Sequence, residues 1–327
     1  MSPASQRSQS NLAAAIGARV TVRLREATGG FRDIVGTLQR CGDGVNELLN
    51  SKGQTITFSV DEIAIWREIK PLPDRAGTGA PYSLRIQELE RISDLTWPAD
   101  EIKELGKWRL RISDGFTMRA NSVLPTGVAP FGEPNLDIDK AVDEVVKIYQ
   151  EKGLTPTFTL PLPLYRELDS YLASVGWRVK VGAEYLVNDI PDNLDLKGAD
   201  FQIMISTEPT PEWLEVQSDY QLERIMRNYP ARYAQIKFQN KTIAIGRIAT
   251  SGKWSLATRV FVYPEFRGKG IGALLMRALM ATAKDEGATK VGLQVDSENG
   301  AGLALYKSMG FRFHHSYNYR ILGDESK

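Results

Sequence analysis

The sequence holds little of the chemistry on which many enzymes depend. Cys41 is its only cysteine, and His314 and His315 are its only histidines among 327 residues. A single cysteine forms no intrachain disulfide, and these counts exclude a cysteine-based metal centre. They also exclude a histidine-based triad or a multi-histidine metal site in the first two-thirds of the chain. We therefore expect no metal cofactor, and the scarcity of cysteine fits a reducing cytoplasm.

An excess of charge of one sign and long apolar runs are also lacking. Lys plus Arg (41) and Asp plus Glu (40) nearly cancel, which argues against binding to nucleic acid or to an anionic membrane mainly through charge. No apolar run approaches the roughly 20 residues that span a bilayer. The first 17 residues lack the apolar core of a signal peptide. We therefore expect a cytoplasmic protein with no membrane or nucleic-acid partner.

The chain does have enough apolar material, 42% of its residues, for two or three domains. Residues 1–15 are rich in Ser, Ala, Gln and Asn, and we expect them to form a disordered tail. In residues 16–72, about five short segments alternate polar and apolar residues between Gly-containing turns, which predicts a small closed β-barrel. This segment resembles an SH3-like barrel. The Pro/Gly-rich residues 73–82 are expected to be a linker.

Beyond the linker, helices and strands mix, and the same order of elements occurs twice. Leu172–Trp177 and Tyr306–Phe311 each end a helix with Gly before an aromatic residue that enters a strand. We interpret residues 83–200 (the front half) and 201–327 (the second half) as an internal duplication, each with a mixed α+β sheet flanked by helices. A chance similarity between two α/β segments is the alternative.

Four expected elements bear on the site. Apolar residues at helical spacing predict helices over Asp137–Lys152 and Gly270–Glu286. A further helix is expected over Trp213–Arg227, and a strand over Thr117–Leu124.

The strongest signal is an apolar strand that runs through a glycine-rich turn into a helix, Val260-Phe-Val-Tyr-Pro-Glu-Phe-Arg-Gly-Lys-Gly-Ile-Gly-Ala273. The first backbone N–H groups of such a helix lack internal partners and lie at the positive end of its dipole. Glycines let phosphate oxygens approach them closely. The spacing fits neither a Walker loop nor a convincing dinucleotide fingerprint. On this stretch alone, a turn that merely starts a helix is an equal alternative.

Some 30 residues on, the chain reads Leu293-Gln-Val-Asp-Ser-Glu-Asn299, then Leu305-Tyr-Lys-Ser-Met-Gly-Phe311. Together with the turn, these residues resemble the GNAT acyltransferase superfamily, whose pattern is V-x-P-x-[FY]-R-G-x-G-[IL]-G, then L-x-V, Asn and L-Y-x-x-x-G-F. The likeness covers about 60 residues and implies GNAT-like folds in tandem. The layout, with an SH3-like barrel before two such halves, resembles that of a family of actinobacterial acetyltransferases. The stretch Arg119-Ala-Asn-Ser-Val-Leu-Pro125 adds to this resemblance.

The resemblance implies an acetyl-CoA site in the second half. Backbone groups of Val260–Val262 would pair with the pantetheine arm, those from Gly268 to Ala273 would hold the pyrophosphate, and Asn299 would bind the pantetheine region. Tyr306 would be the catalytic residue that protonates the departing CoA thiolate; a packed core aromatic is the alternative. The expected cofactor-binding residues are Val260, Phe261, Val262, Arg267, Gly268, Lys269, Gly270, Ile271, Gly272, Ala273 and Asn299. For Arg267 and Lys269, a solvated side chain is an equal alternative to phosphate attraction.

The function so implied is transfer of the acetyl group of acetyl-CoA to a primary amine, on a small molecule, a protein lysine or a protein N-terminus. Many members of the superfamily carry a Glu as general base in the strand before the Asn, but this chain has Gln294, which cannot take a proton. The remaining candidates for the base are a water chain, a group from the front half, Asp296, Glu298, His314 and His315. The missing Glu keeps a second hypothesis open, a non-catalytic acetyl-CoA sensor or a module that docks on a partner through its barrel.

The front half lacks this machinery. No glycine-rich turn precedes its long helix, and Leu172 stands at the place of Tyr306. We therefore expect it to serve as scaffold and as a wall of the acceptor site. Arg119, Asn121 and Ser122 would face either the acceptor or solvent, and whether the chain forms a homodimer is left open.

Overall fold

The structure, a computed structural model, describes residues 12–42, 44–50, 53–69, 80–196 and 201–323. The chain divides into two compact units, Met1–Asp74 and Arg75–Lys327. The division falls in the expected linker, whose residues 73–79 lie outside the described residues.

The N-terminal unit is an antiparallel sheet of five strands in the order β4-β3-β2-β1-β5. Its strands are β1 (Arg19–Arg25), β2 (Phe31–Gly42), β3 (Val45–Leu49), β4 (Thr55–Ser59) and β5 (Ile63–Glu68). Alternate residues of β1, Val20, Val22 and Leu24, are buried in its core because successive side chains of a strand point to opposite faces. Strands β4 and β5 form the two edges, and the described residues show no pairing between them. The closed barrel is therefore not confirmed, and its SH3-like character stays a prediction.

The expected disordered tail is too long at its C-terminal end. Leu12 and Ala15 are buried in the core of the N-terminal unit, together with β1 and β2. Their apolar side chains thus pack in the fold, although the polar residues around them suggested a tail. Residues 1–11 lie outside the described residues.

The second unit contains helices and strands from both expected halves. Its strands are β6 (Glu101–Leu105), β7 (Trp108–Ile112), β8 (Val123–Pro125), β9 (Thr157–Leu162), β10 (Arg178–Asp189), β11 (Gln202–Ser206), β12 (Arg232–Phe238), β13 (Lys241–Ser251), β14 (Trp254–Val262), β15 (Lys290–Asp296) and β16 (Arg312–Ile321). Its α-helices are α2 (Tyr82–Thr96), α3 (Ile138–Glu151), α4 (Arg166–Ser174), α5 (Pro211–Glu215), α6 (Glu223–Arg227), α7 (Ile271–Asp285) and α8 (Gly300–Ser308). The 3₁₀-helices are η1 (Asp219–Leu222) and η2 (Pro264–Phe266). Helices α3 and α7 thus lie where the sequence predicts them.

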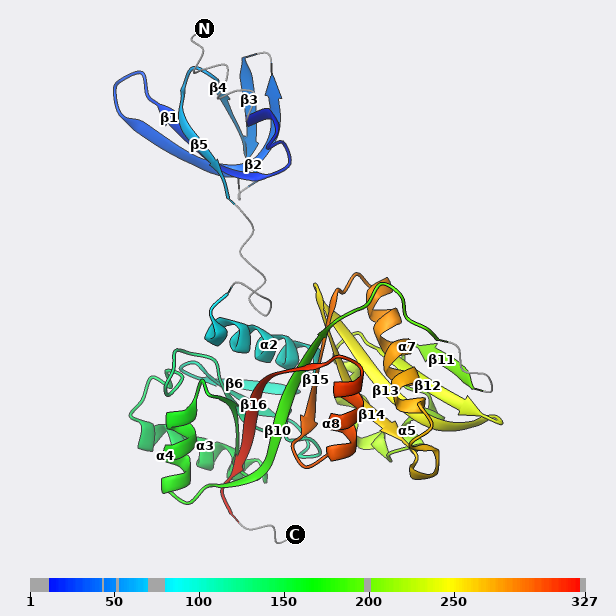
Figure 1. The fold of residues 1–327 in the computed structure, drawn as a ribbon. Helices are drawn as coiled ribbons and strands as arrows, with labels where there is room; N and C mark the ends of the chain where they lie inside the picture. Colours follow the sequence, from blue (N-terminus) through cyan, green and yellow to red (C-terminus); the bar gives the residue numbers. More distant parts are fainter. Residues whose placement is uncertain (1–11, 43, 51–52, 70–79, 197–200, 324–327) are drawn as a thin grey trace. The chain divides into compact units, whose positions relative to one another are not determined.

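All these strands form one sheet in the order β11-β12-β13-β14-β15-β10-β16-β9-β8-β7-β6. The last strand of each half is exchanged. Strand β10, from the front half, pairs with β15, and β16, from the end of the chain, pairs with β9. These two strands also pair with each other, so that red β16 lies beside green β10 in Figure 1. The sheet therefore runs without a break through both halves, and each half is completed by a strand of the other.

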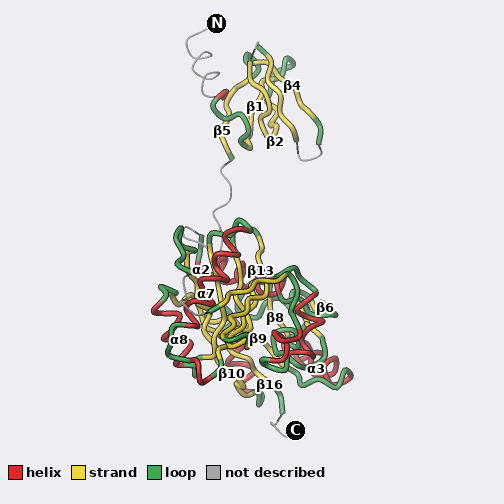
Figure 2. The backbone as a smooth tube through the Cα atoms, turned by 90° about the vertical axis from the view of Figure 1, so that its right-hand side faces the viewer, coloured by secondary structure: helices red, strands yellow, loops and turns green. Residues whose placement is uncertain are grey.

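Helices cover both faces of this sheet, and Figure 2 shows the strands in the middle of the unit. Helix α7 packs through Leu275 and Leu279 on the face that carries Val291 and Leu293 of β15. The opposite face carries α2, whose Leu89 and Ile92 contact β10 and β14. Helices α5 and α6 form a further core with β12 and β13, and α3 and α4 form the core of the front half.

Two expected elements are wrong in detail. The helix expected over Trp213–Arg227 is interrupted: α5 ends at Glu215, and Ser218, with a left-handed φ of 54°, redirects the chain before η1. Trp213 and Met226 both pack in one core. Residues 117–122, expected as part of a strand, form a loop. Asn121 donates to the Thr117 carbonyl at 2.8 Å and accepts from the Ser113 N–H at 2.8 Å, so its side chain supplies bonds that a strand partner would otherwise make.

Candidate active site

The site begins where two parallel strands separate. Strands β14 and β15 pair from Trp254 to Ala257, and β14 then continues to Val262 with no further pairing to β15 among the described residues. On its other side β14 stays paired with β13 as far as Val262. A bulge at Arg259, with φ 55°, redirects the strand at this point. The side of Val260–Val262 that would face β15 therefore has no strand partner among the described residues, and a ligand could add there as a strand.

The turn after β14 exposes backbone N–H groups. Gly268 and Gly270 have φ values of 72° and 76°, in a backbone region that residues other than glycine rarely adopt. Gly270 is the N-cap of α7, and no side chain caps this end. The first intrahelical bond runs from the Leu274 N–H to the Gly270 carbonyl, at 3.0 Å. In the described part of the chain, the N–H groups of residues 271–273 have no partner, and they lie at the positive end of the helix dipole.

Helix α8 forms the facing wall. Asn299 caps it, accepting from the Gly302 N–H at 2.9 Å. A Cβ atom at position 302 would lie 2.8 Å from Asn299 Nδ2, so glycine is what lets this side chain fold over the helix end. At Gly272, likewise, a Cβ atom would lie 2.9 Å from Leu305 Cδ2, so α7 and α8 approach closely there.

These parts enclose one cavity of about 520 Å³. It brings together Tyr306 and ten of the eleven expected cofactor-binding residues, all except Lys269. Arg267 lines the cavity, but its Nε donates to the Val262 carbonyl at 3.0 Å and its guanidinium lies over the Phe261 ring. Its first role is thus to fold the turn. The Lys269 ammonium lies 5.3 Å from the centre of the Phe266 ring.

Tyr306 is 8% exposed and reaches this cavity from α8. Its ring packs against Phe311, with 5.6 Å between the ring centres. No hydrogen bond to its hydroxyl occurs within the described residues. Burial raises the pKa of Tyr306 to about 12, so the phenol keeps its proton at neutral pH and is available as a donor.

The named candidates for the general base lie in two places, the turn with Asp296 and Glu298 and the pair His314 and His315, and Gln294, which cannot take a proton, lies in a third. Gln294 is half-buried on β15 and accepts from Arg119 Nη2, which comes from the front-half loop. Asp296 is exposed, and its carboxylate accepts from the Glu298 N–H at 2.8 Å, which shapes the turn before Asn299. His314 and His315 are buried and hydrogen-bonded to each other, and His315 also contacts Glu90 of α2. The structure thus places no carboxylate of the expected set at the position of Gln294.

The three polar residues that the sequence singles out in the loop 117–122, Arg119, Asn121 and Ser122, also make different contacts. Ser122 bonds to the Met118 carbonyl at 2.6 Å, so Ser122, like Asn121, holds the loop together. Arg119 alone among the three reaches the second half. The sequence drew attention to Arg119, but its contact with Gln294 joins positions 175 residues apart and has no local signal.

The counterpart of the split in the front half is poorly equipped to hold a phosphate. Strands β8 and β9 pair only through Val123 and Phe158. Beside the start of α4, a cavity of about 390 Å³ is lined by residues that include Pro130 and Pro163, which have no backbone N–H. Leu172 is fully buried in the front-half core, as expected for a residue that packs.

No helix of the described residues is long and apolar enough to cross a membrane. Within the same residues, no group of three or more His, Cys, Asp and Glu side chains is placed to hold a metal ion.

Known proteins are similar to this chain over most of its length. A family model described as "Probable histone acetyltransferase Rv0428c C-terminal" matches residues 84–320. The uncharacterized N-acetyltransferase YobR of Bacillus subtilis is 29% identical over 250 residues, covering 72% of this chain and 98% of that protein. The probable histone acetyltransferase Rv0428c of Mycobacterium tuberculosis is 25% identical over 317 residues, covering 93% and 94%. A solved GCN5-related N-acetyltransferase from Kribbella flavida shares the fold with a TM-score of 0.58 at 14% identity, covering 77% of this chain and 98% of that one.

Proposed function

This chain belongs to the family of the Rv0428c C-terminal acetyltransferase, within the GNAT class of acyltransferases, and we propose that it transfers the acetyl group of acetyl-CoA to a primary amine. One observation carries the proposal. The open edge of β14, the unpaired N–H groups of α7, Asn299 and Tyr306 all surround the same cavity of about 520 Å³.

The residues of this cavity fit acetyl-CoA as the acyl donor. Unpaired N–H groups at the start of α7 bind the pyrophosphate. No side chain caps this helix end, so its N–H donors, at the positive end of the helix dipole, are available to an anion. The space beside Gly268 and Gly270 supports this, because a Cβ atom there would meet nothing within 4 Å. The backbone of Val260–Val262 binds the pantetheine arm along the edge that β15 leaves free.

Tyr306 acts as the general acid. The amine nitrogen attacks the thioester carbonyl carbon, the carbon–sulfur bond breaks, and the sulfur takes the phenolic proton of Tyr306. Because the pKa of Tyr306 is raised to about 12 by burial, the proton is present at every physiological pH. The amine nitrogen loses its own proton to water, and the phenolate regains a proton from water after the thiol has left.

Arg119 contributes to the acceptor side. Burial by itself lowers the pKa of its guanidinium, but the tyrosine hydroxyls of β10 and β16 and Glu90 outweigh this, and the net shift is upward. Arg119 is therefore a fixed cation next to Gln294. A like charge disfavours an ammonium at this place, so the acceptor binds as the neutral amine, and a carboxylate base is not required at position 294.

We propose a protein lysine as the acceptor, since the family and one relative carry the name of probable histone acetyltransferases. The N-terminal unit is proposed to be an SH3-like docking module, and the protein to act in the cytoplasm.

Calorimetry with acetyl-CoA tests the site. We expect one site per chain, and Gly270→Asp should abolish binding because a carboxylate would then face the pyrophosphate. Gly287→Asp is the matched control, since Gly287 also has a positive φ and open space but lies at the other end of α7. Two equivalent sites, or undisturbed binding by a folded Gly270→Asp protein, would contradict the proposal. Release of CoA thiol with histone-like peptides, peptides without lysine and small amines then identifies the acceptor class.

A further inference from the structure

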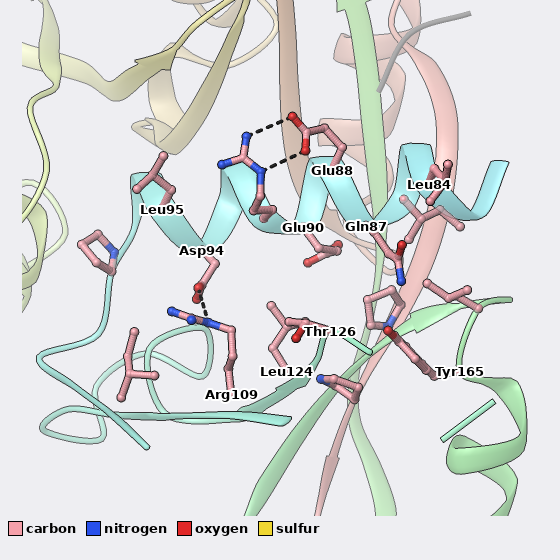
Figure 3. A pocket seen from close by; sticks show the side chains of 17 residues that line it. Leu84, Gln87, Glu88, Glu90, Asp94, Leu95, Arg109, Leu124, Thr126 and Tyr165 are labelled. Atoms are coloured by element: carbon pink, nitrogen blue, oxygen red, sulfur yellow. Dashed lines mark hydrogen bonds and ion pairs between the residues drawn. The ribbon is translucent and has the colours of Figure 1, made fainter. Parts of the chain in front are cut away.

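A second and larger cavity, of about 580 Å³, lies between α2 and the strands of the front half (Figure 3). It shares no residue with the cavity around Tyr306. Its walls are mostly apolar and include Leu95, Ile102, Leu124, Pro161 and Leu164. Cavities of this size and character accept drug-sized organic molecules.

The cations around this cavity are paired with carboxylates. Arg109 Nε bonds to Asp94 at 3.0 Å, and its Nη1 bonds to Glu104 at 2.8 Å. Arg91 and Glu88 pair with each other at 2.9 Å, and Figure 3 shows this pair on the side of α2 away from the strands. The two arginines that line the cavity are therefore each paired with a carboxylate, and Arg119, whose pKa Glu90 helps to raise, does not line it.

Glu90 differs from the other carboxylates. It is 5% exposed and points from α2 into the space between the helix and the strands (Figure 3). Its Oε1 contacts His315 Nε2 at 2.8 Å, and within the described residues its Oε2 has no partner. A carboxylate accepts several hydrogen bonds, and Glu90 makes one to His315, so it has capacity for further donors. A ligand with N–H donors would satisfy it.

Glu90 is also held in place from below. A bulge in β16 puts two consecutive residues, His314 and His315, on the face under α2. Their Nδ1 atoms are 2.9 Å apart, and the His315 ring stacks on Tyr185 with 4.8 Å between centres. The buried histidine pair therefore fixes the carboxylate before any ligand arrives, which is the condition for tight recognition at low entropic cost.

We propose that this cavity is a second ligand site, which binds a small apolar molecule bearing a primary ammonium group, with the ammonium on Glu90 and the carbon skeleton against the apolar walls. The site is separate from acetyl transfer. Its sheet residues lie on β9, β8 and β7, which are three to five strands from β15. At about 4.8 Å per strand, the apolar walls lie about 14–24 Å from β15. Glu90 contacts His315 of β16, two strands or about 10 Å from β15, so the bound amine lies outside the cavity around Tyr306.

Three probes of one shape and different charge test the proposal by calorimetry on the full chain without acetyl-CoA. They are 2-phenylethylamine, 2-phenylethanol and 3-phenylpropionate. We expect the amine to bind at least about tenfold more tightly than the other two, because a hydrogen bond to a charged group is the difference between them. Glu90→Gln keeps the shape and should remove this preference, whereas Glu88→Gln, with the same charge change on the same helix, should shift the amine affinity less than about twofold.

A second variant keeps the test decisive if Glu90→Gln does not fold. Ile102→Trp narrows the cavity from its rim and leaves Glu90 intact, so it should weaken the amine and the alcohol alike. The proposal would be overturned if the parent protein bound all three probes equally. It would also be overturned if the amine did not bind at a concentration of about 10 mM. A folded Glu90→Gln protein with unchanged preference would overturn it as well. Gly270→Asp should bind the amine normally, which separates this result from the fate of the acetyl-CoA site.

Discussion

Replacement of Tyr306 by Phe removes one hydroxyl group and leaves the packing of the ring intact. The ring contacts Phe311 and is buried in the core around α7, so the apolar contacts survive. No partner of the hydroxyl occurs among the described residues, so no intramolecular hydrogen bond is lost. We therefore expect the free energy of unfolding to change by less than about 1 kcal/mol.

Turnover should respond far more strongly. General acid catalysis contributes about 10²- to 10⁴-fold, and a 10²-fold loss corresponds to roughly 2.7 kcal/mol of barrier. Since the proton transfer occurs only in the transition state, kcat and kcat/KM should fall together while acetyl-CoA affinity stays constant. The pKa of about 12 adds a further expectation. The phenol remains protonated below that value, so the parent enzyme should show no loss of activity from Tyr306 between pH 7 and 10.

The assay combines CoA thiol release, calorimetry with acetyl-CoA and denaturant unfolding on both proteins. Tyr171→Phe is a matched control, because Tyr171 lies on α4 of the front half and its hydroxyl contacts Asp139. A folded Tyr306→Phe protein with turnover within about twofold of the parent would refute the general-acid role. It would shift weight to the sensor hypothesis.

Two further predictions concern pH and domain organisation. Burial, with the charges of His315 and Arg85 adding to it, lowers the pKa of His314 to about 4. In the unfolded chain His314 therefore takes up a proton near pH 6.5, whereas in the folded chain it stays neutral until about pH 4. The free energy of unfolding therefore falls as the pH decreases from 6.5 towards 4. Urea unfolding should show the parent losing about 1–2 kcal/mol more than His314→Gln between pH 6.5 and 5; equal losses would contradict the assignment. Deletion of residues 1–74, the separate N-terminal unit, should leave acetyl-CoA affinity within about twofold, and a folded fragment that cannot bind acetyl-CoA would show that the unit contributes to the site.

The arrangement of the candidate site could be predicted because its signals are local. The turn at Gly268–Gly270, the cap Asn299 and Tyr306 lie within one short stretch of chain, and each leaves a pattern in neighbouring residues. Helix α7 begins where its apolar face begins, and the positive φ of both glycines explains why glycine stands there. That these residues bind acetyl-CoA stays a prediction.

The contacts that the sequence does not reveal join distant residues. Glu90 and His315 are 225 positions apart, and nothing in the pattern of α2 separates Glu90 from its charged neighbours. The exchange of β10 and β16 cannot be predicted from the sequence either, because a strand has the same alternating pattern whichever half it completes. The loop at residues 117–122 differs from the predicted strand for another reason: its apolar and polar residues alternate as in a strand, but Asn121 and Ser122 bond to the loop backbone.

The exchanged strands have a consequence for how the protein is made. Strand β9 has β16 as its neighbour, and β16, residues 312–321, is synthesised long after β9. The front half is synthesised first, but the edge of β9 therefore has no strand partner until more than a hundred further residues have been added. Domains usually fold one after another during synthesis, but here both halves reach their native sheet only together. We expect refolding to be a single late event for the whole second unit, and the waiting edge of β9 to be the place where nascent chains pair wrongly with one another.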